Sequence, residues 1–138
     1  MKYITVRKLK KLNACEDSIN DFINEFGKNC KIHVEKLIEI LHKNKDSNGY
    51  SFWLFKTFKL TGICYGYYDT GKIYYKANYK KGKLDSEYIT YYENGKISCK
   101  ANFKNSLKHG ERIIYHNNGI IYHKENYKND ELIYKEWL

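Results

Sequence analysis

The sequence predicts an α+β fold, in which an N-terminal helical cap precedes an elongated antiparallel sheet of tandem β-hairpin repeats. Three observations support this class. A 24-residue unit repeats three times without gaps over residues 67–138. Apolar and polar residues alternate inside each unit, as they do in half-buried strands. Residues 1–57 lack the unit and instead carry apolar residues at helical spacing.

The first predicted helix begins after Thr5, whose hydroxyl suits an N-cap, and ends near Leu12. Ile4 and Leu9 have the spacing of a hydrophobic staple across that cap. A second helix is predicted from apolar residues at i, i+3, i+4 and i+7, and it ends at Gly27. Its apolar stripe consists of Ile19, Phe22, Ile23 and Phe26.

A third helix with the same spacing is predicted to run to about Lys43. Its stripe consists of Val34, Leu37, Ile38 and Leu41. Asp46–Gly49 has the composition of a turn. Ser51–Phe58 is apolar without a clear period, so a short helix and a first strand are both open, and a helix is favoured. We expect the helices to cover one end or one face of the sheet, so that residues 1–57 and 58–138 form one folding unit.

Each repeat predicts two short strands and two turns. The three units are Tyr67–Thr90, Tyr91–Ile114 and Tyr115–Leu138. A fragment, Phe58–Gly66, matches the last part of the unit and leads into the first copy. The first turn of each unit carries a glycine suited to positive φ, namely Gly71, Gly95 and Gly119. The second turn is expected to be looser, because Ser106 and Asp130 replace the glycine found at Gly82.

Alternation within the strands predicts the buried positions of the sheet. After the first turn they are Ile73, Tyr75, Ala77 and Tyr79, then Ile97, Cys99, Ala101 and Phe103, then Ile121, His123, Glu125 and Tyr127. Before the turn they are Tyr65 and Tyr67, then Ile89 and Tyr91, then Ile113 and Tyr115. Trp137 takes the equivalent place at the end of the last unit.

The opposite face of the later strand repeats the triplet Lys-x-Asn-x-Lys three times in register. Its candidate partner-binding lysines are Lys76, Lys80, Lys100, Lys104, Lys124 and Lys128. The tyrosines expected to lie exposed beside them are Tyr74, Tyr88, Tyr92 and Tyr122. Like charges on neighbouring hairpins repel each other. Either salt and solvent therefore screen the repulsion between these lysines, or a partner binds them. The plainer interpretation is a solvated strand face that discourages edge pairing.

The elements Tyr-Tyr-x-x-Gly-Lys-Ile and Tyr-Lys-x-Gly-Lys-Leu resemble the MORN-type β-hairpin repeats, and above all the bacterial and phage variant often labelled as an antitoxin. The resemblance covers about residues 58–138 and implies a twisted sheet of tandem hairpins that binds proteins or, in some members, lipids. It does not imply catalysis. Ser86 and Tyr134 depart from the pattern, which prefers glycine at these positions and finds it at Gly62 and Gly110. The segment Leu9–Gly27 is similar to an Ala-Cys-x-x-x-Ile-x-x-Phe segment of small phage and bacterial proteins.

Lysine and arginine outnumber aspartate and glutamate by 25 to 16, giving a net charge of +9. The densest basic block comprises Lys2, Arg7, Lys8, Lys10 and Lys11. Such a charge predicts an acidic partner, either nucleic acid, an acidic protein face or anionic lipid, unless it serves solubility alone. Lipid is disfavoured because no apolar anchor accompanies the basic block. No apolar run approaches the about 20 residues of a membrane span, and no signal-peptide stretch is present.

The sequence contains no catalytic motif. Phosphate-binding loops, dinucleotide-binding glycine motifs and recurring carboxylate pairs are missing, and the acids of the array look like scattered turn and rim residues. The cysteines Cys15, Cys30, Cys64 and Cys99 lack zinc spacing and are expected to be reduced thiols. The histidines His109, His116 and His123 are interpreted as substituted sheet residues rather than metal ligands. We therefore expect no enzyme, no catalytic residue, no metal and no cofactor.

The expected function is a non-enzymatic protein-binding inhibitor of the antitoxin or phage counter-defence type, for example against a bacterial nuclease or CRISPR effector. It would dock an acidic protein or a nucleic-acid-bound complex through its repeat sheet and basic face, in the cytoplasm of a bacterial host cell. The alternative is direct binding of single-stranded RNA or DNA by the lysines and exposed tyrosines. A homodimer formed along the exposed last strand is a further alternative.

Overall fold

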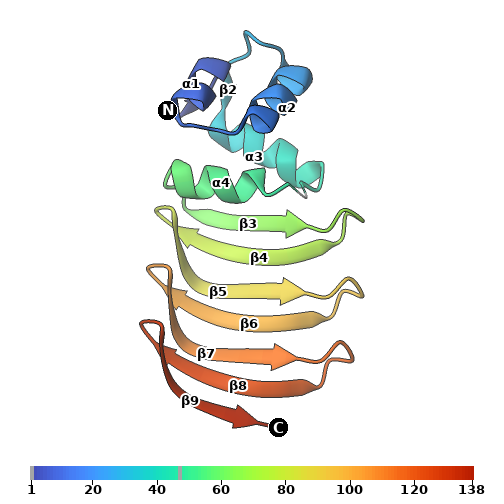
Figure 1. Cartoon of the computed structure of the whole chain (residues 1–138), viewed down its shortest axis with the longest axis vertical. Coiled ribbons are helices and arrows are strands. Elements are labelled where there is room, and N and C mark those ends of the chain that lie inside the picture. The colour runs from blue at the N-terminus through green and yellow to red at the C-terminus, as the bar shows by residue number, and fades with distance from the viewer. Residues whose placement is uncertain (1, 47) are drawn as a thin grey trace. The chain divides into compact units, whose positions relative to one another are not determined.

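The computed structural model describes residues 2–46 and 48–138, which form two compact units, Met1–Lys43 and Asn44–Leu138 (Figure 1). The first is small and mainly helical, and the second holds a seven-stranded antiparallel sheet. This confirms the predicted α+β class. The helix predicted within Ser51–Phe58 belongs to the second unit, whereas the sequence-based division placed it in the cap. Ser47, in the predicted turn, lies outside the described residues.

The first unit contains the three predicted helices and a small sheet that was not predicted. Its helices are α1 (Val6–Lys11), α2 (Glu16–Phe26) and α3 (Val34–Lys43). Thr5 caps α1, since its Oγ1 accepts a hydrogen bond from the Lys8 amide at 3.2 Å. Two-residue strands, β1 (Tyr3–Ile4) and β2 (Ile32–His33), pair antiparallel with each other. The unit's core consists of Ile4, Val6, Leu9, Ile19, Phe22, Val34, Leu37 and Ile38.

The second unit begins with α4 (Tyr50–Thr57), the favoured alternative for this segment, and continues as a simple meander. The strands are β3 (Gly62–Tyr67), β4 (Ile73–Lys80), β5 (Lys83–Tyr91), β6 (Ile97–Lys104), β7 (Leu107–Tyr115), β8 (Ile121–Lys128) and β9 (Glu131–Trp137). Each strand pairs antiparallel with the next, so the order in space is the order in sequence (Figure 1). The Phe55 ring of α4 packs 5.3 Å from the Tyr79 ring, which ties the helix to the first hairpins.

The second turn of each repeat is tighter than the first, which is the opposite of the prediction. The glycine-bearing first turn spans five residues between β3 and β4, whereas the second spans two residues between β4 and β5. Both residues of every second turn have positive φ, as in a type I′ hairpin turn. These pairs are Lys81 with Gly82, Asn105 with Ser106, and Asn129 with Asp130. The expectation of a loose turn was wrong because Ser106 Oγ and Asp130 Oδ1 accept backbone hydrogen bonds from the preceding repeat, at 3.0 and 2.6 Å.

Gly82 is needed because the end of α4 passes close to it. A Cβ at this position would lie 2.7 Å from Lys59 Cα and 3.1 Å from the Lys56 carbonyl oxygen. The later copies have no helix at this place, so serine and aspartate fit there and add a side-chain hydrogen bond.

Gly82→Ala should therefore lower the free energy of unfolding by more than about 1 kcal/mol, through both its positive φ and the backbone clash. Gly95→Ala is the matched control, because its φ is also positive (+84°) but an added Cβ would meet nothing within 4 Å. Urea denaturation of both variants measures the difference. Equal losses would show that the close approach to α4 costs nothing.

The pairing register defines the two faces of the sheet. The lysine face carries the cross-strand row Tyr65, Lys76, Ile89, Lys100, Ile113, Lys124 and Glu136. The aromatic face carries Tyr75, Tyr88 and Phe103 and the row Cys64, Ala77, Tyr88, Ala101, Arg112, Glu125 and Lys135. The positions predicted as buried therefore divide between the faces, and Ile89 and Ile113 share one with the lysines. Ile73, also predicted as buried, is 39 % exposed at a strand end.

The last hairpin is paired one residue out of step with the first two. Ala77 pairs with Tyr88 and Ala101 with Arg112, but Glu125 pairs with Lys135 instead of Glu136. The β4–β5 and β6–β7 pairings each have a register irregularity that contains a residue with positive φ, Ser86 (64°) or Gly110 (97°). The corresponding residue of β9, Tyr134, has no positive φ. The shift places Trp137 on the aromatic face, where it is 60 % exposed, so the predicted equivalence with Ile89 and Ile113 was wrong.

Candidate partner-binding surface

The six predicted lysines lie on one face, but in two different environments. The inner row of Lys76, Lys100 and Lys124 is half-buried, and its members alternate across the strands with Ile89 and Ile113. Ile89 is only 7 % exposed, although the strands of the described residues form no second layer over it. Aliphatic lysine stems commonly cover apolar surface in this way while their ammonium groups stay in water. The inner row thus contributes to packing as well as to charge.

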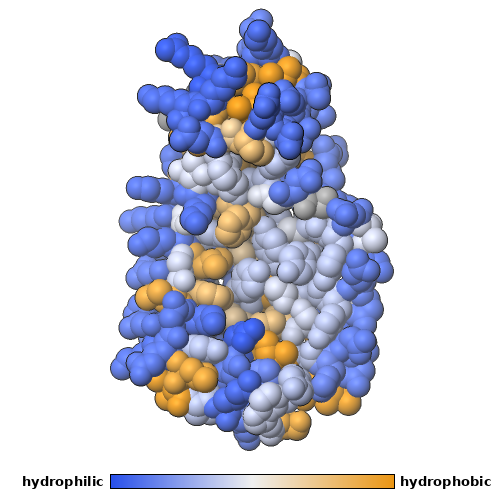
Figure 2. Space-filling model, viewed as in Figure 1, coloured by the Kyte–Doolittle hydropathy of each residue, from blue (hydrophilic) through white to orange (hydrophobic). Residues whose placement is uncertain are grey.

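The outer row of Lys80, Lys104 and Lys128 is exposed and lies at the ends of β4, β6 and β8, beside the two-residue turns. Its members are two strands apart, so their backbones are spaced by about 10 Å. This row presents three cations in register at one border of the sheet. Figure 2 shows hydrophilic side chains gathered at both turn-bearing ends of the strands, with less polar side chains over their middle.

The asparagines of the Lys-x-Asn-x-Lys triplet have a structural role. Asn78 Nδ2 donates to the Glu87 carbonyl oxygen at 2.7 Å, and Asn102 Nδ2 donates to the Glu111 carbonyl oxygen at 3.3 Å. These carbonyls lie where the strand pairing is irregular. The asparagines therefore satisfy backbone groups at the bulges. Asn102 pairs with exposed Glu87, so acidic side chains also lie on the lysine face, between the two rows.

Two of the four predicted tyrosines are exposed. Tyr74 and Tyr122 are 45 % and 40 % exposed. Tyr88 is half-buried on the aromatic face, 6.0 Å from the Tyr75 ring and 5.8 Å from the Phe103 ring, and burial raises the pKa of its hydroxyl to about 12. Its predicted exposure was wrong, because it lies on the face opposite the lysines.

Tyr92 is half-buried and engaged with the next repeat. Its hydroxyl donates to the Tyr115 carbonyl oxygen at 2.7 Å, just as the Tyr68 hydroxyl donates to the Tyr91 carbonyl oxygen one repeat earlier at 2.7 Å. The expectation that Tyr92 is an exposed aromatic was therefore wrong as well, and its hydroxyl links neighbouring hairpins.

A buried charged cluster on the aromatic face of the third repeat was missed. Glu125 is 6 % exposed, although Ala77 and Ala101 occupy its place in the earlier copies. Its Oε2 accepts hydrogen bonds from Arg112 Nη1 at 2.6 Å and the Tyr127 hydroxyl at 2.9 Å. Its Oε1 lies 3.0 Å from His123 Nε2 and 3.5 Å from Lys135 Nζ. The acids of the array are thus not all turn and rim residues, and the break in the alanine pattern was the available signal.

The cluster keeps Glu125 ionised. Burial alone raises the pKa of this carboxyl, but hydrogen bonds from Arg112, Tyr127 and His123 outweigh it and bring the pKa to about 2. Because Glu125 is anionic, His123 Nε2 donates to it, and Nδ1 is buried without a hydrogen-bond partner among the described residues. The arrangement places one carboxylate between the side chains of Arg112 and Lys135.

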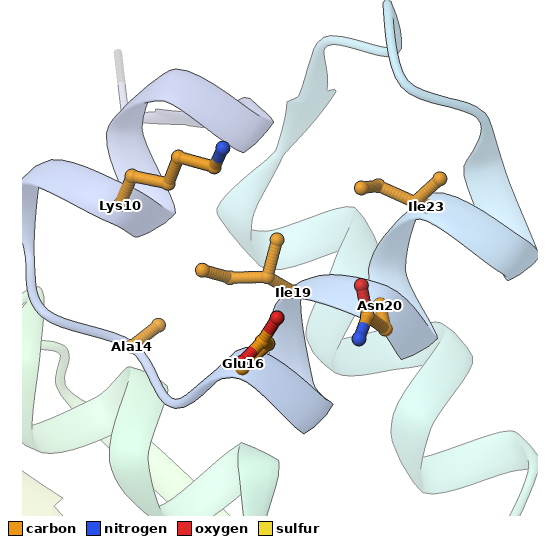
Figure 3. A pocket seen from close by; sticks show the side chains of 6 residues that line it. All are labelled: Lys10, Ala14, Glu16, Ile19, Asn20 and Ile23. Carbon is orange, nitrogen blue, oxygen red and sulfur yellow. The ribbon is translucent and has the colours of Figure 1, made fainter.

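Elsewhere in the described residues, a hollow of about 310 Å³ lies beside α1 and α2 of the first unit (Figure 3). Its lining consists of Lys10, Ala14, Glu16, Ile19, Asn20 and Ile23. Within residues 2–46 and 48–138, no group of three or more histidine, cysteine, aspartate or glutamate side chains is arranged to hold a metal ion. In the same residues, no helix is long and apolar enough to cross a membrane.

Comparison with known proteins agrees with the 24-residue repeat. The family model described as MORN repeat variant matches three successive segments, residues 60–81, 84–105 and 108–129. The segments coincide in turn with the strand pairs β3–β4, β5–β6 and β7–β8, and their starts are 24 residues apart. None of the curated proteins compared with the chain matches it. The hairpins of this sheet are therefore MORN repeats of the variant type.

Proposed function

We propose that this chain is a non-enzymatic protein-binding module that docks an acidic protein through its lysine face. The observation that carries the proposal is the register of the outer row, which presents Lys80, Lys104 and Lys128 exposed along one border of the sheet. MORN repeats generally bind proteins or membranes, and the net charge of +9 favours an acidic partner. Exposed charges of this kind mainly steer association and select the partner.

The finer proposal is an inhibitor of the antitoxin or phage counter-defence type, acting in the cytoplasm of a bacterial cell on a protein such as a nuclease or CRISPR effector. Its support is the basic charge, the size of 138 residues and the repeat type. Inhibition by docking needs only a complementary surface and no chemistry of its own.

Direct binding of single-stranded nucleic acid is the second candidate, because exposed Tyr74 and Tyr122 could stack bases near the lysines. It is less well supported than protein binding. Tyr88 and Tyr92, the other two aromatics expected for stacking, are engaged within the fold.

The double reversal Lys104→Glu with Lys128→Glu should abolish capture of a protein partner from a bacterial extract while leaving the fold intact, since both side chains are exposed. Lys10→Glu with Lys11→Glu is the matched control, because it makes the same change in net charge at two exposed positions of the first unit. Each bait is used with and without nuclease. Capture that survives nuclease and is lost only with the sheet variant supports the proposal, and capture that disappears with nuclease supports the nucleic-acid alternative.

A further inference from the structure

The last strand presents an open edge with apolar side chains on both faces. Among the described residues, β9 pairs with β8 only. Leu132 and Trp137 lie on the aromatic face and are 48 % and 60 % exposed, and Tyr134 lies on the lysine face and is 51 % exposed. The unpaired backbone groups of an edge strand can form hydrogen bonds with a strand of another chain. The side chains on both faces of the edge strand would then contact the side chains of the added strand.

The same edge carries opposite charges on its two faces. Lys135 points to the aromatic face, where it shares the single carboxylate of Glu125 with Arg112. The Lys135 and Arg112 side chains are 31 % and 32 % exposed, so the excess positive charge is accessible. Lys135 Nζ also lies 4.1 Å from the centre of the Trp137 ring. Glu136 points to the lysine face, beside Lys124.

We propose that β9 binds an extended, antiparallel strand of another protein that reads apolar–basic–acidic–apolar from its N-terminal end. Side chains directly opposite each other on paired strands point to the same face and interact. The four positions then lie opposite Trp137, Glu136, Lys135 and Tyr134 in turn. The acidic side chain reaches the accessible positive charge beside Glu125, and the basic one faces Glu136.

A second copy of the chain fits this edge poorly. Symmetric antiparallel pairing centred on Lys135 places that lysine opposite itself, and pairing centred on Glu136 does the same for the glutamate. Pairing centred on Tyr134 sets the charged side chains of Lys135 and Glu136 against Ile133 and Leu132, next to the irregularity in the β8–β9 pairing. Pairing centred on Ile133 would set Lys135 against Glu131, but the irregularity places these two side chains on opposite faces of the sheet. The partner is therefore a different chain with the complementary charge order.

Two synthetic peptides of identical composition test the proposal on the unmodified protein. One contains Val-Lys-Glu-Val and the other Val-Glu-Lys-Val, both with the same threonine flanks. Titration of the isotope-labelled chain, followed by the backbone amide signals of Glu131–Trp137, gives both affinity and location. We expect the first peptide to perturb β9 and to bind at least about fivefold more tightly, because both of its charge pairs are attractive.

Two variants sharpen the result. Lys135→Glu with Glu136→Lys should reverse the preference between the peptides, and Trp137→Ala, at an exposed position, should weaken the binding of the preferred peptide while the chain stays folded. Lys11→Glu, at an exposed position of the first unit, should change neither and is the control. Equal affinities, perturbation away from β9 or no binding of either peptide would overturn the proposal. So would sedimentation showing a dimer that Trp137→Ala dissociates, which would assign the edge to a second copy.

Discussion

Tyr79→Ala should lower the free energy of unfolding by about 3–5 kcal/mol, the range for removing a large buried aromatic side chain. Tyr79 is 5 % exposed and contacts the rings of Phe55 and Phe52, at 5.3 and 6.1 Å between centres. Its loss leaves a cavity where α4 meets the first hairpins. Chemical denaturation of the wild type and the variant gives the value directly.

Two companion variants identify the cause. Tyr79→Phe should leave stability unchanged or raise it, because the Tyr79 hydroxyl is buried without a hydrogen-bond partner among the described residues, and Phe103 occupies the same position one repeat later. Tyr74→Ala, at a position 45 % exposed, should cost less than about 1 kcal/mol. If Tyr74→Ala were as damaging as Tyr79→Ala, the assignment of the aromatic face as the packed one would fail.

Glu125→Gln should cost about 3 kcal/mol at neutral pH and much less below pH 3. The pKa of Glu125 in the folded chain is about 2, below its ordinary value of 4.5. A carboxyl with a depressed pKa contributes stability that is fully present above its unfolded pKa and is lost as the pH falls through the folded pKa. A depression of this size corresponds to about 3 kcal/mol. The stability difference between wild type and variant should therefore shrink between pH 4.5 and 2.

The comparison of thermal unfolding at pH 7 and pH 2.5 tests this directly. Glu131→Gln is the control, because Glu131 is exposed on the edge strand and should change stability little at either pH. A pH-independent difference for Glu125→Gln would mean that the carboxylate charge contributes nothing and that only shape matters at this position.

Local signals in the sequence predicted most of the elements. The Thr5 cap, the apolar stripe ending at Gly27 and the recurring turn glycines each act within a few residues, so they can be read without knowing the partner strands. The two small strands β1 and β2 were missed because two residues are too few to show alternation. The 24-residue period predicted the tandem hairpins, and the meander follows from it.

Register was the part that the sequence did not reveal. Alternation within one strand separates the side chains on its two faces. It does not say which of these two sets lies on the same side of the sheet as a given set on the neighbouring strand. Ile89 was correctly predicted to be buried, but its place between the lysines was not foreseen. Tyr88 was expected to be exposed, although it is half-buried on the opposite face. Likewise, Tyr134 lacks the positive φ of Gly110, and the resulting shift in pairing register places Trp137 on the opposite face of the sheet. Such shifts depend on backbone geometry at single bulges.

The most direct test of the central proposal is the salt dependence of binding, measured with the captured partner in purified form. Wild type and the Lys104→Glu, Lys128→Glu variant are titrated at several salt concentrations. We predict that the wild type binds a nuclease-treated protein, that the variant binds it at least about tenfold more weakly at low salt, and that the difference narrows as exposed charges are screened. Equal affinity of the two proteins would contradict the proposal. So would affinity only for a nucleic acid, with the steep logarithmic salt slope of about 0.7 to 0.9 per phosphate contacted.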